Sequence, residues 1–208
     1  MPTVKNGYRR VGVGAQYICF EDATQQSGFE TTVTKMENVA SIQTTEGRIS
    51  ETVYGSNKVF EEETAQNPPS MVVANRAFPA DVLHRMNGHT ISGAWVTHNN
   101  RDEGEYFAYG IVFPKRNGKD TYIWYPKCKL TAASADRDGN TKDANGINAA
   151  EPSLTIRAFE FNDAGDYEVE YDCELVTEGN TPITEAAFFA APLTAPLTAP
   201  SPTVNNGV

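Results

Sequence analysis

The chain has 208 residues, of which 39% are hydrophobic and 21% charged, and its formal net charge is −10. This length suits one domain with a substantial core. The acidic balance argues against a partner held through its phosphates, because such proteins need Lys and Arg to displace counterions. No stretch has the pattern of a secretory signal or a membrane span, so we expect a soluble protein made in a cytoplasm.

The cysteines indicate a reducing compartment. Cys19, Cys128 and Cys173 are an odd number of thiols, each inside an apolar run and none close in sequence to another. This usage favours buried thiols over a disulfide framework.

The first part of the chain predicts strands and a hairpin. Residues 1–7 are expected to form an N-terminal arm, residues 8–20 a first strand, and residues 31–44 a further strand-like stretch. Residues 48–54 and 58–64 flank a Gly-Ser-Asn sequence, whose Gly and Asn suit the positive φ angles of a tight turn. The hairpin is polar along much of its length, so we expect it to project from the core.

The middle of the chain predicts one helix and then three strands. Residues 79–86 have Pro at the first turn and are followed by Asn-Gly as a stop, which is typical of a short helix. Residues 91–97, 106–113 and 121–130 read as strands. The last two are apolar on both faces, so they should be covered on both sides.

The last part predicts a long loop, a hairpin and a tail. Residues 134–150 are rich in Asp, Asn and Gly, and loops of this length usually have a function or make contacts. Residues 154–161 and 167–176 predict a final hairpin. From residue 185 an Ala-Pro-Leu-Thr repeat predicts a flexible Pro/Thr/Ala-rich tail to residue 208, which leaves residues 8–184 as the β-domain.

Two acidic runs are the strongest polar signals. Along residues 167–175, apolar and acidic positions alternate with a period of two, which is typical of a strand with one packed face and one wet face. The wet face carries the acids Glu168, Glu170, Asp172 and Glu174. The second run is Glu61, Glu62 and Glu63. Taken alone, such runs usually form a solvated outer face.

Nothing in the sequence predicts an enzyme, a cofactor or a metal site. His84, His89 and His98 lack ligand spacing and are interpreted as ordinary surface or packing residues. The Gly-Val-Gly at residues 12–14 lacks the third glycine of a dinucleotide loop. The Asp-Arg-Asp-Gly-Asn at residues 136–140 lacks the register and closing Glu of an EF-hand and fits turn chemistry better.

A second class of function stays open on the aromatic residues. The run at residues 122–125 is Tyr-Ile-Trp-Tyr, and Trp95 precedes it. These side chains could stack against sugars on a lectin-like sandwich, although aromatics in strands are more often core or interface. The alternative function is therefore a carbohydrate-binding β-sandwich on a particle or cell surface.

Short motifs occur in a recognisable order over residues 8–176. They are Tyr54-Gly55-Ser56-Asn57, Phe78-Pro79-Ala80-Asp81-Val82-Leu83, Gly93-Ala94-Trp95-Val96, Tyr106-Phe107-Ala108-Tyr109-Gly110 and Tyr122-Ile123-Trp124-Tyr125-Pro126-Lys127-Cys128-Lys129-Leu130. In their order and spacing the chain resembles the major tail proteins, or tail tube proteins, of long-tailed siphovirus-type bacteriophages. Each motif is short and structural.

This resemblance implies a mainly β fold: a two-sheet β-sandwich or barrel with one short flanking α-helix. It also implies hexameric rings that stack into a hollow tail tube and conduct DNA during ejection. The expected partners are other copies of the chain, a tape measure protein, and tail tip and tail terminator proteins. The expected location is the virion tail, assembled in the host bacterial cytoplasm.

The resemblance also gives roles to three sets of residues. The hairpin is expected to make ring-stacking contacts, through Arg48, Glu51, Tyr54, Gly55, Asn57 and Lys58. The long loop is expected to contact a neighbouring subunit, through Asp136, Arg137, Asp138 and Asn140. Acids from the two runs are expected to face the lumen, because an acidic wall does not hold DNA. Which of the two runs faces the lumen stays open. Whether the tube belongs to a non-contractile tail or to a contractile injection device stays open as well.

Overall fold

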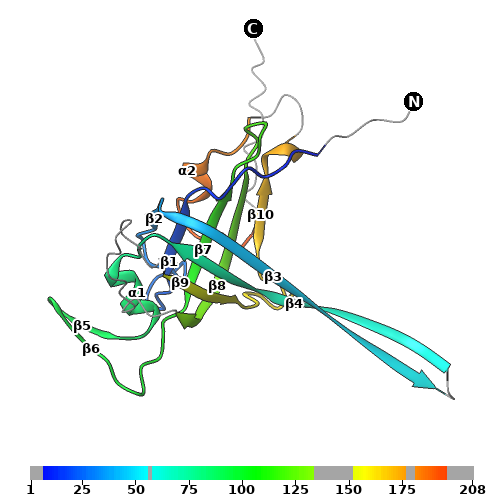
Figure 1. Ribbon diagram of the computed structural model, residues 1–208, viewed down its shortest axis with the longest axis horizontal. Helices are drawn as coiled ribbons and strands as arrows, with labels where there is room; N and C mark the ends of the chain where they lie inside the picture. The colour runs from blue at the N-terminus through cyan, green and yellow to red at the C-terminus, as the bar shows by residue number, and fades with distance from the viewer. Residues whose placement is uncertain (1–6, 56–57, 134–151, 177–180, 196–208) are drawn as a thin grey trace, which may run out of the picture. The chain divides into compact units, whose positions relative to one another are not determined.

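The computed structural model describes residues 7–55, 58–133, 152–176 and 181–195, and for residues 46–66 it describes the backbone without the side chains (Figure 1). The strands are β1 (Gln16–Phe20), β2 (Thr34–Met36), β3 (Val39–Gly55), β4 (Lys58–Asn75), β5 (Thr90–Ser92), β6 (Trp95–Thr97), β7 (Phe107–Phe113), β8 (Thr121–Ala133), β9 (Ser153–Ala158) and β10 (Val169–Asp172). The helices are α1 (Ala80–Met86) and α2 (Glu185–Phe188), and a 3-10 turn spans Cys173–Leu175.

The prediction of a mainly β protein is confirmed, but the strands are not arranged as the predicted two-sheet sandwich. Hydrogen bonds order the strands as β2-β1-β7-β8-β9-β4-β3, with β10 also paired to β8. Strands β5 and β6 form a separate pair. The chain, predicted as one domain from residue 8 to 184, divides into two compact units: residues 1–37, 108–126 and 168–208, and residues 38–107 and 127–167.

The first unit has a core rich in aromatic side chains. All residues of β1 are buried, as are residues 108–113 of β7 and 121–126 of β8, as their two apolar faces predict. The buried cluster consists of Tyr17, Cys19, Phe29, Ala108, Val112, Tyr122, Trp124, Cys173, Phe188 and Phe189. The predicted first strand begins late, at Gln16, because the residues before it are largely exposed.

Helix α2 overturns the prediction of a flexible tail from residue 185. Thr184 caps the helix by accepting a hydrogen bond from the amide of Ala187. Phe189 then stacks on Tyr17 with ring centroids 4.0 Å apart, and the indole of Trp124 donates to the carbonyl of Phe188 at 3.1 Å. Two adjacent phenylalanines thus place a segment of tail-like composition in the hydrophobic core. Residues 196–208 of the predicted tail lie outside the described part of the chain.

One glycine makes this packing feasible. A Cβ on Gly110 of β7 would lie 2.7 Å from the ring of Phe189 and 3.0 Å from that of Trp124. Any larger residue would therefore push the aromatic side chains of α2 and β8 away from β7.

The second unit contains the predicted hairpin, which is confirmed and longer than expected. Strands β3 and β4 pair from Val39 with Asn75 to Gly55 with Lys58, and Figure 1 shows them as two long cyan ribbons. Strand β4 also pairs with β9, but only over residues 70–74. The register shifts opposite Pro68 and Pro69, which cannot donate to a ladder. Among the described residues, β3 is thus the only strand paired with residues 58–67 of β4.

Helix α1 and the strands after it complete the second unit. The predicted helix is confirmed: Pro79 stands at its N-cap, and Val82, Leu83 and Met86 are buried. The strand predicted over residues 91–97 is instead the β5–β6 hairpin, because Gly93 has φ +61° and reverses the chain. The last predicted strand ends at Asp172, where the 3-10 turn begins.

Candidate functional site

The stacking residues predicted on the hairpin lie on one ribbon. Register pairs Arg48 with Gln66, Glu51 with Glu63, and Tyr54 with Val59, and Gly55 with Lys58 closes the described ladder. The acids Glu61 and Glu62 pair in register with Val53 and Thr52. Both predicted sets, the stacking residues and the acidic run 61–63, therefore share the end of the ribbon next to the turn.

Some predicted residues lie outside the described part of the chain. They are Asn57 of the hairpin and Asp136, Arg137, Asp138 and Asn140 of the long loop. Their predicted roles stay predictions.

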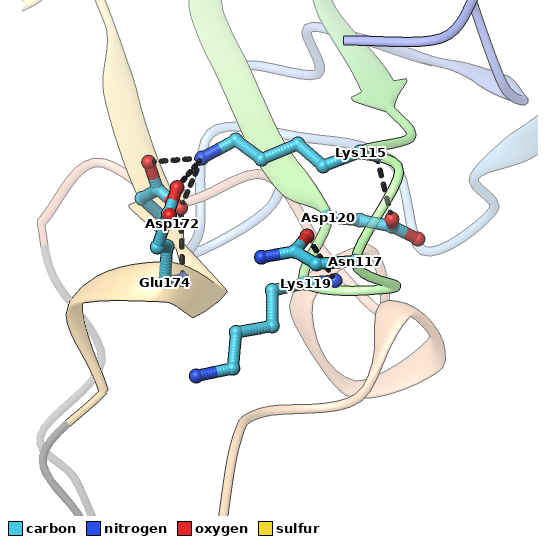
Figure 2. Close-up of polar contacts among 6 residues, drawn as sticks. All are labelled: Lys115, Asn117, Lys119, Asp120, Asp172 and Glu174. Carbon is cyan, nitrogen blue, oxygen red and sulfur yellow. Dashed lines mark hydrogen bonds and ion pairs between the residues drawn. The ribbon is translucent and has the colours of Figure 1, made fainter. Parts of the chain in front are cut away.

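The other acidic run contains an ion-pair cluster in the first unit. The ammonium of Lys115 lies 2.7 Å from one carboxylate oxygen of Asp172 and 2.8 Å from the other, and 2.9 Å from the carboxylate of Glu174 (Figure 2). The Lys115 side chain is only 7% exposed, and those of Asp172 and Glu174 are 21% and 26% exposed.

A tight turn places Lys115 in this position. Gly118, at φ +71°, donates to the carbonyl of Lys115 at 2.9 Å. The backbone amide of Lys115 donates to the carboxylate of Asp120 at 3.1 Å, and that of Lys119 donates to the side-chain oxygen of Asn117 at 3.1 Å (Figure 2). The Asn-Gly turn between β7 and β8 thus presents one lysine to the end of β10.

The charges in this cluster support one another. Burial lowers the pKa of Lys115, but the hydrogen bonds and charges of Asp172 and Glu174 outweigh it, so the pKa is raised above its usual value. Burial raises the pKa of Asp172, but the hydrogen bonds from Lys115 and from the amide of Glu174 outweigh it, so the pKa is lowered. Lys115 and Asp172 are therefore held in their charged forms around neutral pH.

The predicted acidic face is thus divided. Asp172 and Glu174 are bound to Lys115, whereas Glu170 lies exposed in β10. The alternation holds on the packed face as far as Cys173, which is buried, but fails at Leu175, which is 82% exposed. It fails because the carboxylate of Asp172 accepts from the amide of Glu174 at 2.9 Å and starts the 3-10 turn.

A basic pocket in the second unit was not predicted. It is an open pocket of about 410 Å³, lined by Lys127, Arg157, Tyr106, Phe159, Pro68, Ala158 and Glu160. The ammonium of Lys127 lies 5.3 Å from the ring centre of Tyr106, and the guanidinium of Arg157 lies 5.6 Å from that of Phe159. The two rings meet edge to face at 5.9 Å. We call these residues the basic pocket.

Sequence patterns give little warning of this pocket. Lys127 and Lys129 stand two apart in β8, so they share one face of a strand. Their proximity to Arg157 depends on the pairing of β8 with β9 across a stretch of chain that has no hairpin signal. Long-range strand pairing is not encoded in a local pattern.

The three histidines lie side by side in the structure, although their spacing in the sequence did not predict a cluster. His84 and His89 lie 3.0 Å apart between their Nδ1 atoms, and Nδ1 of His98 lies 3.0 Å from Nε2 of His89. Both ring nitrogens of His89 therefore bond other histidines. Consistent with this, the described residues hold no group of three or more His, Cys, Asp or Glu side chains able to hold a metal ion.

The aromatic residues of the sugar-binding alternative have different environments. Trp124 is fully buried, so it cannot stack on a sugar. Trp95 on β6 is 80% exposed. The three thiols predicted to be buried, Cys19, Cys128 and Cys173, are indeed buried and form no disulfide. None of the helices described is both long and apolar enough to cross a bilayer.

Comparison with known proteins gives a likeness in structure and none in sequence. No protein-family model matches the sequence, and neither does any curated protein. Among solved structures, the chain is similar to a chain in the cryo-EM structure of the anti-feeding prophage (AFP) baseplate, 6-fold symmetrised. The two are 9% identical, the match covers 84% of this chain and 100% of that chain, and the TM-score is 0.41. At this level the likeness settles neither fold nor function.

Proposed function

We propose that this protein is a self-assembling structural subunit of a phage-type tail tube, which stacks as hexameric rings around a channel for DNA. The β3–β4 hairpin carries the proposal. Beyond the register shift at Pro68 and Pro69 it continues, within the described part of the chain, as a ribbon of two strands. An isolated two-stranded ribbon is marginally stable in water, and its edges are templates for pairing.

Assembly would stabilise this ribbon and cover its unpaired edges. A neighbouring copy that covers the ribbon removes its exposed edges, and a head-to-tail contact of this kind grows an open filament. The resemblance of the sequence motifs to tail tube proteins points the same way. Tape measure, tail tip and tail terminator proteins would then be the partners, and the virion tail the location.

An acidic chain suits a channel for DNA. The net charge of −10 disfavours retention of a polyanion on the wall. Asp172 and Glu174 are bound to Lys115. We therefore assign the lumen role to Glu170, which is exposed in β10 and lies outside that cluster.

Electron microscopy of the purified protein tests this function. At high concentration we expect sixfold rings or hollow tubes in negative stain. A variant in which a two-residue Asn-Gly turn replaces residues 48–66 should keep the wild-type melting temperature and form no tubes. Tubes of the same length from that variant would contradict the role of the hairpin.

Trp95→Ala is the matched control, because it changes an exposed aromatic residue outside β3 and β4. It should assemble like the wild type, with a free energy of unfolding within about 0.5 kcal/mol of it. A protein that stays monomeric at every concentration and salt, and binds a glycan through Trp95, would replace the tube with the carbohydrate-binding alternative.

A further inference from the structure

Three cations share one face of the second unit, in a chain that has 17 Lys and Arg against 27 Asp and Glu. Lys129 of β8 and Arg157 of β9 are directly opposite each other in register. Lys127 stands two residues before Lys129 on the same face of β8. Like charges directly opposite each other destabilise a strand pair, so this arrangement needs an anion.

Only one of the three cations has its anion within the described chain. Lys129 binds the carboxylate of Glu103 at 2.7 Å. Lys127 and Arg157 form no ion pair with any other described residue, and each is held against an aromatic ring instead. Both line the basic pocket, in which Glu160 is the one acidic side chain among the described lining residues. The pocket thus presents an ammonium and a guanidinium that are oriented but not neutralised.

We propose that the basic pocket binds carboxylate side chains of a second copy of this chain, supplied by the acidic run Glu61, Glu62 and Glu63. The proposal rests on the proposed function and gives the ring-stacking contact a chemical identity. Arg157 suits a carboxylate through its paired N–H donors, and Lys127 adds a point charge beside it.

The run 61–63 is the best match among the acids of the chain. It is the longest unbroken acidic run in the sequence. It lies on the two-stranded part of the ribbon, where another copy would cover the edges. The other acidic run is already in part neutralised, because Asp172 and Glu174 bind Lys115.

Charge exchange tests this contact. Lys127→Glu/Arg157→Glu and Glu61→Lys/Glu62→Lys/Glu63→Lys should each lower assembly about tenfold in sedimentation, because each places like charges together. An equimolar mixture of the two variants should recover assembly, because the acidic pocket of the first fits the basic run of the second, and the unaltered pocket of the second fits the unaltered run of the first. Arg116→Glu/Lys119→Glu is the control, since it makes the same change in charge on the exposed turn of the first unit.

A peptide of residues 58–66 gives a readout that does not depend on tubes. It should bind the full-length protein by fluorescence anisotropy, weaken as salt rises, and bind about tenfold less well to Lys127→Glu/Arg157→Glu. Circular dichroism melts confirm that each variant is folded.

The outcomes separate this inference from the proposed function. Normal assembly of both charge variants, with no peptide binding, would overturn the inference and leave the tube intact. Peptide binding through the pocket by a protein that never assembles would keep the inference and remove the tube. Binding of a single-stranded oligonucleotide that is lost in Lys127→Glu/Arg157→Glu, with no binding of the peptide, would overturn it in favour of a nucleic-acid site.

Discussion

At the scale of single residues, one lysine decides how the acids at the end of β10 behave. Lys115 is almost fully buried and contacts two carboxylates that are themselves about three-quarters buried or more. Taking one partner away from such a cluster leaves charge that is neither hydrated nor paired, which costs more than the pair itself contributes. The acids of this run alternate regularly in sequence but differ in role: Asp172 and Glu174 form ion pairs with Lys115, whereas Glu170 is exposed.

Lys115→Met should lower the free energy of unfolding by about 2–3 kcal/mol at pH 7, because Asp172 and Glu174 then repel each other without a cation. Chemical denaturation measures the change. Lys119→Met is the matched control on the same turn, since Lys119 is exposed, and it should change stability by less than about 0.5 kcal/mol. Equal losses in the two variants would show that the cluster contributes nothing specific.

The same cluster sets a pH dependence. The pKa of Asp172 is lowered in the folded state, so its contribution is complete above the unfolded pKa of about 3.9 and is lost as pH falls through the lower folded value. The pKa of Lys115 is raised, so its contribution persists below about pH 10.4 and is lost as pH rises through the folded value. The stability gap between wild type and Lys115→Met should therefore narrow below about pH 4.

At the scale of elements, α2 is a short helix that contributes Phe188, and Phe189 directly after it, to the hydrophobic core of the first unit. Glu185 at its start accepts from the hydroxyl of Tyr17 at 2.5 Å and lies 3.3 Å from the ammonium of Lys35. Burial and the Glu185 contact raise the pKa of Tyr17 to about 12. The ring of Phe189 packs against Tyr17 of β1 and Trp124 of β8, and that of Phe188 packs against Tyr122 of β8. A four-residue helix has little stability of its own, so these side chains hold it in place.

Truncation after residue 184 should unfold the first unit at temperatures where the intact protein is stable, because it removes two buried phenylalanines worth about 3–5 kcal/mol each. Near-UV circular dichroism and the thermal midpoint measure this loss. Truncation after residue 195 is the control, since it keeps every contact described for α2. A chain ending at residue 184 with an unchanged midpoint would restore the interpretation of this segment as a tail.

The sequence predicted those elements whose signals are local. The β3–β4 hairpin and α1 were both found, because turn residues and a helix stop mark their limits. The failures involve distant partners. Phe188 and Phe189 lie in a tail-like composition and are recruited by Trp124 and Tyr17, and the basic pocket depends on the pairing of β8 with β9. Neither partner can be read from the neighbouring residues.

At the scale of the whole molecule, the proposed tube predicts that the acidic balance of the chain affects the passage of DNA. Glu170→Lys places a cation at an exposed position of the acidic run, and we expect DNA release from particles that carry it to slow down as the wall becomes attractive. The rate of release after triggering measures this effect. Asp172→Lys is not an equivalent test, because it also breaks the cluster around Lys115. An unchanged rate of DNA release from Glu170→Lys particles would show that Glu170 does not face the lumen.

The position of α2 in the chain also sets an order of events during synthesis. The second unit is complete once residue 167 has been made, whereas the first unit draws on both early and late segments. The hydroxyl of Tyr17 meets a partner 168 residues further along. Tyr17 of β1 therefore lacks its aromatic partner Phe189 until that late residue has been translated. A nascent chain therefore cannot complete its first core early, and in the proposed tube only a chain that carries α2 would join with this core formed.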